Sequence, residues 1–169
     1  MRRLTLAITL LALLSCMGMR SDPGKSASLN RFQNDFLTRI NNVRTAGCKC
    51  GKTYMPPVEP LSWNSLLERS AYGHALDMST RRYFNHTSLS GKTIKNRLEE
   101  AGYNLTGMRT YAFGENIAAG QKSIDQVMTS WLKSEGHCKN IMSPHFKEIG
   151  VAETNLHWVQ DFGMRVARN

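Results

Sequence analysis

Long apolar runs are scarce in this 169-residue chain. The most apolar stretch, residues 4–14, has eleven residues and is interrupted by Thr5 and Thr9. A helix of that length cannot cross the hydrocarbon core of a bilayer, which is about 30 Å thick. Because Arg2 and Arg3 precede it, the stretch is typical of a secretory signal peptide and not of a transmembrane segment.

The residues that end this stretch predict a lipid anchor. Leu13-Leu14-Ser15-Cys16 resembles a bacterial lipobox, in which cleavage before the cysteine leaves Cys16 as the lipid-bearing N-terminus. Two or more acyl chains would hold the protein firmly on a membrane. Met17 stands where an aspartate would signal retention at the inner membrane, so we expect the outer membrane or the cell surface. The alternative is an ordinary cleaved signal followed by an incidental cysteine.

The chain therefore divides into three predicted parts. Residues 1–15 form the signal peptide, residues 16–28 the lipidated cysteine and a flexible tether, and residues 29–166 one domain. The tether is small and polar and contains Pro23 and Gly24, which disfavour regular structure. The roughly 140 residues that remain suit a single hydrophobic core.

Acidic residues are few, 13 against 22 lysines and arginines, and the net charge is +9. Removal of the signal peptide would lower it to +7. The basic residues are scattered, and Arg81-Arg82 is the only adjacent pair in the domain. A nucleic-acid-binding protein typically clusters its basic residues on one face. We therefore expect no nucleic-acid partner, and assign the charge to general solubility or to contact with anionic envelope surfaces.

Hydrophobic periodicity predicts an α+β domain. Apolar residues recur at helical spacing over residues 29–45, with Ser28 as a candidate N-cap, and over residues 62–83, 93–101 and 123–136. Three prolines indicate a loop over residues 48–60. The C-terminal part changes to β-type spacing, which predicts an antiparallel hairpin around Thr154-Asn155, and residues 109–113 are a further candidate strand. We expect a three-layer α-β-α sandwich around a small antiparallel sheet.

Several motifs occur in a fixed order along the domain, namely Asn41–Arg44, Tyr83–Ser88, Gly114–Ala118, Trp131–His137, Asn140–Met142, Ile149–Val151 and Trp158–Gly163. Each alone is weak, but together they cover essentially the whole domain. The pattern resembles the CAP superfamily of cysteine-rich secretory proteins, antigen 5 and pathogenesis-related proteins. It is most similar to the bacterial branch, which has S-x-G-H-x-x-N-I after the tryptophan. The resemblance implies the same α-β-α sandwich.

The resemblance also implies a cleft lined by a His-Glu-Glu-His tetrad. His86 matches the first histidine, Glu115 the first glutamate and His137 the second histidine. The second glutamate is missing, because its position holds Ser134. Glu135 is the next residue, but one step on a helix turns a side chain by about 100°, so we expect it to face elsewhere.

Two imidazoles and a carboxylate are suitable ligands for zinc or another divalent metal, with water completing the coordination. The candidate ligands are His86 and His137, with Glu115 as a third. In the alternative interpretation, Glu115 binds backbone amides of a loop over residues 114–120, and the histidines are merely hydrogen-bonded in a polar cleft. There is no H-E-x-x-H motif, and His74 is expected to be a hydrogen-bonded histidine of the core.

A hydrolase would need a nucleophile beside one of these histidines. Ser88, Thr87 and Ser134 lie near them in sequence, but no G-x-S-x-G motif accompanies them. We therefore assign no catalytic residue and expect no required cofactor.

Cysteines are also few. With Cys16 lipidated, three remain for an oxidising compartment, and we expect Cys138 to pair with Cys48 or Cys50. Zinc bound by the three thiolates, or free thiols, are the alternatives.

These observations favour an exported, membrane-anchored binding module whose His86, Glu115 and His137 cleft holds a divalent metal, a lipid, a peptide or a cell-envelope ligand. A hydrolase that uses the same cleft and a structural envelope lipoprotein are the alternatives.

Overall fold

The computed structural model describes residues 28–168, so the predicted signal peptide, Cys16 and nearly all of the tether lie outside the described residues. The first helix, α1 (Arg31–Ala46), begins at a capping box formed by Asn30 and Gln33. The side chain of each accepts a hydrogen bond from the backbone amide of the other, at 3.0 and 2.9 Å. Because this reciprocal pair satisfies two amides that the helix leaves free, the N-cap is Asn30, and the prediction of Ser28 was wrong.

The second predicted helix starts later than expected. Ser62 and Trp63 form a short strand, β3 (Ser62–Trp63), and α2 (Ser65–Arg81) follows. Asn64 separates them, and its side-chain oxygen accepts hydrogen bonds from the amides of Leu66 and Leu67. The next helix, α3 (Ile94–Glu100), agrees with the prediction to within one residue at each end.

The helix predicted over residues 123–136 is two helices. The first, α4 (Ile124–Lys133), ends where Ser134 takes an extended backbone, and α5 (Glu135–Ile141) starts directly after it. Ser123 caps α4 by accepting from the amide of Gln126, whose side chain accepts from the amide of Lys122 instead of Ser123. Helical periodicity alone does not reveal such a break, because both helices place apolar residues on the core.

The loop predicted over residues 48–60 contains a small hairpin. Its strands, β1 (Cys48–Cys50) and β2 (Thr53–Met55), pair antiparallel in their own two-stranded sheet. The turn between them uses Gly51 with a φ of 59°, a conformation that glycine adopts without strain. The prolines at 56, 57 and 60 restrict only the chain after Met55, so they do not prevent this pairing.

The main sheet has four strands in the order β3-β5-β6-β4. The predicted C-terminal hairpin is β5 (Glu148–Thr154) with β6 (His157–Val166), and its turn residues Asn155 and Leu156 both have positive φ, as in a type I′ turn. β4 (Thr110–Ala119) pairs along its full length with β6. The sheet is not purely antiparallel, because the short β3 runs parallel to β5.

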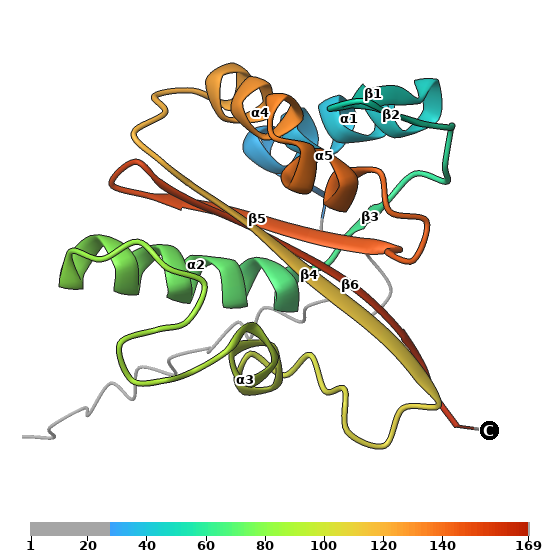
Figure 1. Cartoon of the computed structure of the whole chain (residues 1–169). Coiled ribbons are helices and arrows are strands. Elements are labelled where there is room, and N and C mark those ends of the chain that lie inside the picture. The colour runs from blue at the N-terminus through green and yellow to red at the C-terminus, as the bar shows by residue number, and fades with distance from the viewer. Residues whose placement is uncertain (1–27, 169) are drawn as a thin grey trace, which may run out of the picture.

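Helices cover both faces of this sheet, as expected for an α-β-α sandwich (Figure 1). α1, α4, α5 and the hairpin lie on one side, and α2 and α3 lie on the other. The larger apolar cluster, centred on Phe36, Trp131 and Phe162, fills the first interface. On the second, α2 approaches β5 so closely that a Cβ atom at Gly150 would come within 2.0 Å of the backbone nitrogen of Glu68.

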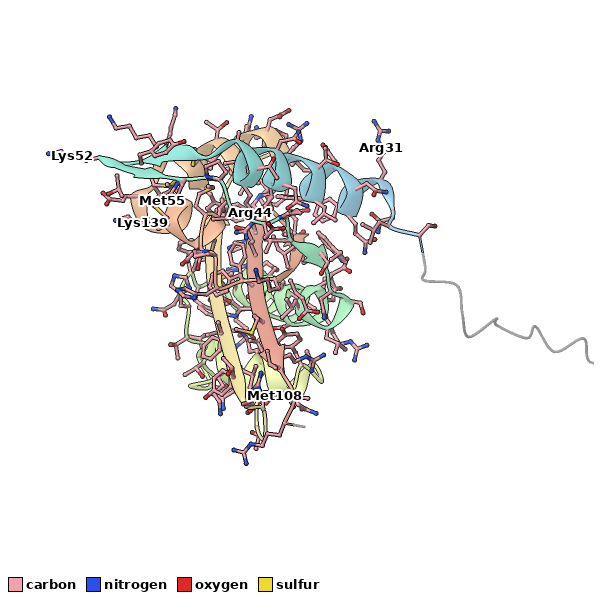
Figure 2. All side chains as sticks on the ribbon, turned by 90° about the vertical axis from the view of Figure 1, so that its right-hand side faces the viewer. Arg31, Arg44, Lys52, Met55, Met108 and Lys139 are labelled. Carbon is pink, nitrogen blue, oxygen red and sulfur yellow. A yellow bond between two sulfur atoms is a disulfide. The ribbon has the colours of Figure 1, made fainter. Side chains whose placement is uncertain are left out.

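The Asn41–Arg44 motif is structural. The side chain of Asn41 bonds both backbone groups of Leu61. The fully buried guanidinium of Arg44 donates to the carbonyls of Glu59 and Ile141, at 2.8 and 2.6 Å. Figure 2 shows Arg44 beneath α1, at the end of the sheet. Burial lowers its pKa to about 10, so the guanidinium stays protonated at neutral pH and joins α1 to the α5 region.

Within residues 28–168, no helix is both long enough and apolar enough to span a bilayer.

Candidate functional site

His86 and Glu115 meet although 29 residues separate them. His86 lies in the connection between α2 and α3, and Glu115 lies in the middle of β4. The Nδ1 atom of His86 is 2.7 Å from Oε1 of Glu115. Because a carboxylate only accepts hydrogen bonds, Nδ1 carries the proton and donates it. The Glu115 side chain is 3% exposed and that of His86 is 56% exposed. A buried carboxylate therefore holds an imidazole ring that is itself open to solvent.

Glu115 stands in a strand, so the predicted loop over residues 114–120 was wrong. The backbone of β4 pairs with β6 throughout, and Glu115 is opposite Asp161. Residues 116–118 are buried, so the segment contributes to the core as well as to the site. The Glu115 side chain binds other side chains and does not cap the backbone of a loop.

Arg97 on α3 completes the environment of Glu115, and sequence reasoning missed it. Its Nη2 atom lies 2.5 Å from Oε2 of Glu115, and its Nη1 atom donates to the carbonyls of His86 and Lys92. Burial opposes ionisation of Glu115, but the hydrogen bond from His86 and the charge of Arg97 outweigh it and hold the pKa of Glu115 below its ordinary value. Glu115 is therefore a carboxylate at neutral pH, with both oxygens engaged.

A second carboxyl group, Asp161 on β6, belongs to the residue directly opposite Glu115 in the register of β4 and β6. Its side chain is fully buried, and within residues 28–168 neither of its oxygens has a hydrogen-bond partner of ordinary geometry. Burial and the nearby charge of Glu115 raise the pKa of Asp161 well above its ordinary value, so the protonated form of this group is favoured. In the sequence, an aspartate within the predicted strand segment Trp158–Phe162 indicates a buried carboxyl group but not which residue it faces.

His137 approaches the same site from α5. Its ring is half-buried, and burial together with the charge of His86 lowers the pKa of His137, so the ring is neutral at neutral pH. Asn116 and Asn140 hold α5 against β4, because Asn116 donates to the carbonyl of His137 and Asn140 donates to the carbonyl of Glu115. His86 is bonded to Glu115 of the same strand, so β4 holds both histidine-bearing segments at one site.

The remaining predicted residues lie outside this group of bonded side chains. His74 is a buried histidine whose Nε2 donates to the carbonyl of Asn85, as the sequence predicts. Ser134 occupies the junction between α4 and α5, where its side chain makes no capping bond. Glu135 is exposed, pairs with Lys139 and lies beside Gly51 of the hairpin, so it does not supply the missing carboxylate.

A cavity of about 340 Å³ opens between α2 and α3 behind this site. Ser70, His74, Ser88, Lys92 and Arg97 are among its lining residues. Arg97 therefore contacts both the cavity and Glu115, and through Glu115 it is connected to His86.

The three cysteines of the domain form a separate cluster. A disulfide joins Cys138 to Cys50, one of the two pairings considered from the sequence. Cys48 is free and half-buried, and burial raises the pKa of its thiol. Within residues 28–168, this is the one set of three histidine, cysteine or acidic side chains whose ligand atoms all lie within 4.8 Å of one another. It is a set that could hold a metal, whereas His86, Glu115 and His137 do not meet that spacing.

Two Bacillus subtilis proteins are similar to this chain in sequence. The chain is 36% identical over 107 residues to the Bacillus subtilis protein YkwD, which covers 62% of this chain and 40% of YkwD. It is 31% identical over 102 residues to the B. subtilis membrane protein YlbC, covering 60% of this chain and 28% of YlbC. The chain thus spans less than half the length of either relative.

Two solved structures resemble it as well. An extracellular protein from Bacillus anthracis that contains an SCP domain superposes with a TM-score of 0.59 at 25% identity, over 85% of this chain and 45% of that protein. An outer surface protein of Borrelia burgdorferi gives a TM-score of 0.58 at 20% identity, over 80% of this chain and 92% of the other.

The family model for CAP, the cysteine-rich secretory protein family, matches residues 37–162, which include every residue of the His86 site described above. This match covers well over half of the chain and contains all four strands of the main sheet up to Phe162. The chain therefore belongs to the CAP family.

Proposed function

We propose that this protein is an exported binding module and that the His86 and His137 end of the cleft contacts its ligand. One observation carries the proposal. His86 presents an exposed ring whose Nδ1 is held by a buried, ionised Glu115. A ring held in this way has a fixed orientation and, in its neutral form, presents Nε2 as an acceptor with a defined direction to whatever enters from solvent.

The chemistry of two imidazoles and a carboxylate suits a divalent metal such as zinc, although the ligand atoms of the three side chains are not all within 4.8 Å of one another without a metal. His86 and His137 would hold it, and Glu115 would act through His86, because both of its oxygens are already bonded by His86 and Arg97. Carboxylates that bind the far nitrogen of a metal-bound histidine set its tautomer and raise its basicity. The lowered pKa of His137 keeps that ring unprotonated and available at neutral pH. When bound, the metal would supply a Lewis acid with open positions for water or a ligand group.

Binding is favoured over hydrolysis by a protein nucleophile. Within residues 28–168, no serine, threonine or cysteine side chain is hydrogen-bonded to the ring of His86 or of His137. A nucleophile and its base normally lie within hydrogen-bond reach of each other. A lipid, peptide or envelope polymer bound beside the histidines is consistent with these contacts, and the protein's own chemistry would not cleave it by that route.

Export and lipid anchoring are part of the same proposal. The sequence over residues 1–16 favours a cleaved signal and a lipidated Cys16. Two similar proteins are an extracellular protein and an outer surface protein, and a third is a membrane protein. Cys16→Ala should abolish metabolic labelling with palmitate, and labelling that persists would show that the anchor is not at this residue.

Zinc titration by calorimetry tests the site itself. The protein would lack residues 1–15 and carry Cys16→Ala, and it would be metal-stripped with its disulfide intact. We expect about one equivalent of zinc, weakened at least about tenfold by His86→Ala or His137→Ala and also weakened by Glu115→Gln. His145→Ala is the matched control, because His145 is an exposed histidine outside the cleft. Absence of binding, or equal weakening by His145→Ala, would refute the two-histidine site.

A further inference from the structure

The three cysteine side chains meet because of strand alternation. Cys48 and Cys50 are two residues apart on β1, and side chains at that spacing point to the same face of a strand. That face lies against α5, which supplies Cys138. The Sγ atom of Cys48 is 3.8 Å from that of Cys50 and 3.7 Å from that of Cys138. One sulfur more than a disulfide needs is therefore held in contact with both disulfide sulfurs.

The surroundings of the cluster are apolar on the inside and basic at the rim. Cys50 and Cys138 are fully buried, while Cys48 and Cys138 line a cavity of about 320 Å³ whose walls include Val43, Ala46 and Leu132. Lys49 also lines that cavity. Figure 2 shows Lys52 and Lys139 on the same side of the molecule, around the hairpin. A small ion can reach the sulfurs through this cavity, and the lysines favour an anionic complex.

We propose that, when the Cys50–Cys138 disulfide is reduced, the three thiolates bind one Cu⁺ ion. Thiolates are soft ligands that select Cu⁺, Zn²⁺ or iron–sulfur clusters. A structural zinc site almost always has four protein ligands. Within residues 28–168, no histidine, aspartate or glutamate joins the three cysteines as a fourth ligand. Cu⁺ is satisfied by three thiolates, so the number of sulfurs favours it over zinc.

Cys48 also provides the route by which the buried disulfide is opened. Its thiolate attacks Sγ of Cys138, a Cys48–Cys138 bond forms, and Cys50 leaves as a thiolate that takes up a proton. One thiolate of an external dithiol then attacks the half-exposed sulfur of Cys48, so Cys138 leaves and a mixed disulfide with Cys48 forms. The second thiolate of the reagent closes its own disulfide and releases Cys48, so two electrons pass from the dithiol to the protein. Binding of Cu⁺ then displaces the protons of the three thiols. In the reverse exchange an external disulfide takes up the two electrons and the Cys50–Cys138 bond forms again; that form has too few thiolates, so the ion is released.

Titration with Cu⁺ tests the proposal and is independent of the zinc experiment on the histidines. The protein lacking residues 1–15 and carrying Cys16→Ala is reduced with a dithiol, freed of it and titrated anaerobically with Cu⁺ against a chromophoric Cu⁺ chelator. We expect one ion per chain, with ultraviolet thiolate-to-copper charge-transfer absorption. Cys48→Ser should weaken binding at least about 100-fold, because one of three ligands is lost. This variant keeps the disulfide pair, and circular dichroism of its oxidised and reduced forms reports whether the fold is kept.

Two controls separate this site from the cleft and from other metals. A His86→Ala/His137→Ala variant should bind Cu⁺ at the cysteines as tightly as the parent, and the oxidised parent should show no charge-transfer absorption. The proposal is overturned if Cys48→Ser binds as tightly as the parent or if Zn²⁺ binds the reduced cluster in preference to Cu⁺. Loss of the folded structure on reduction would overturn it as well.

Discussion

Two consecutive residues of α5, His137 and Cys138, belong to two different sites. Successive side chains of a helix differ in direction by about 100°, so one helix can face both. His137 belongs to the polar His86 site, where His86, Glu115 and Arg97 are connected by hydrogen bonds. Cys138 faces the sulfur cluster beside α1 and the hairpin, where contacts are covalent or apolar. One site is held by charge pairing and the other by a cross-link, so they should respond to different perturbations.

The largest effect is expected from Arg97→Met. The Arg97–Glu115 pair is almost completely buried, with side-chain exposures of 8% and 3%. Removing one partner leaves an uncompensated charge in the protein interior, which typically costs about 3–5 kcal/mol. We expect a loss of that order in the free energy of unfolding, measured by urea denaturation at pH 7.

Two variants sharpen this prediction. Arg97→Met/Glu115→Gln removes both charges and should recover at least half of the loss. Lys139→Met removes one partner of an exposed pair with Glu135 and should cost at most about 1 kcal/mol. A loss for Arg97→Met as small as that for Lys139→Met would show that the cleft is not held by this buried pair.

In the cysteine cluster, a substitution should lower the free energy of unfolding less when a remaining cysteine can take over the disulfide. The Cys50–Cys138 disulfide spans 88 residues, and loss of a native disulfide typically costs about 2–5 kcal/mol. Cys138→Ala removes the partner that both pairings need, so we expect that full cost. In Cys50→Ala, Cys48 can pair with Cys138, because their Sγ atoms are 3.7 Å apart, and less than half of the cost should remain.

Urea denaturation of the two oxidised variants and peptide mapping by mass spectrometry measure this difference. A Cys48–Cys138 cross-linked peptide should appear in Cys50→Ala. Equal losses in the two variants, without that peptide, would contradict the prediction.

The smallest expected effect is on the pH dependence of stability, to which Asp161 and Glu115 contribute with opposite signs. The raised pKa of Asp161 means that its contribution to stability is complete below its ordinary pKa of 3.8 and is lost as the pH rises through its value in the folded state. Asp161→Asn cannot ionise, so its stability relative to the parent should increase as the pH rises above about 4.

Glu115 has the opposite sign. Its lowered pKa gives a contribution that is present above its ordinary value of 4.5 and is lost as the pH falls through the folded value. Glu115→Gln should therefore cost most near neutral pH and least in acid. Thermal denaturation of both variants between about pH 4 and pH 8 checks this. A constant offset of Asp161→Asn from the parent at every pH would show that the carboxyl group of Asp161 titrates normally.

Local signals in the sequence predicted much of the architecture. Helical periodicity located α1, α2 and α3 to within three residues, and β-type spacing around Asn155 located the C-terminal hairpin. Helical periodicity did not reveal the break at Ser134, because one periodic pattern covers two helices. The short hairpin that begins at Cys48 was also missed, because the prolines after it predicted a loop. The two failures have the same cause. Periodicity indicates which residues face the core, and that pattern is hardly altered by a break in a helix or by a three-residue strand.

The site was predictable only where the sequence motif named its residues. His86 and Glu115 do meet, as the resemblance implies. Arg97 and Asp161 were missed, because an arginine on a short amphipathic helix and an aspartate in a strand carry no local sign of a partner. Asp161 acquires its significance from the register that sets it opposite Glu115.

The sequence by itself determined the order of helices and strands, the residues that face the core and the motifs that mark the family, because these depend on neighbours three or four positions away. Tertiary structure decided which charge is paired with which, which carboxyl group has its pKa raised and which has it lowered, and which cysteine reaches Cys138. Those outcomes depend on through-space distances and on the loss of water around each group, and both are set only when β4, β6 and α5 pack together.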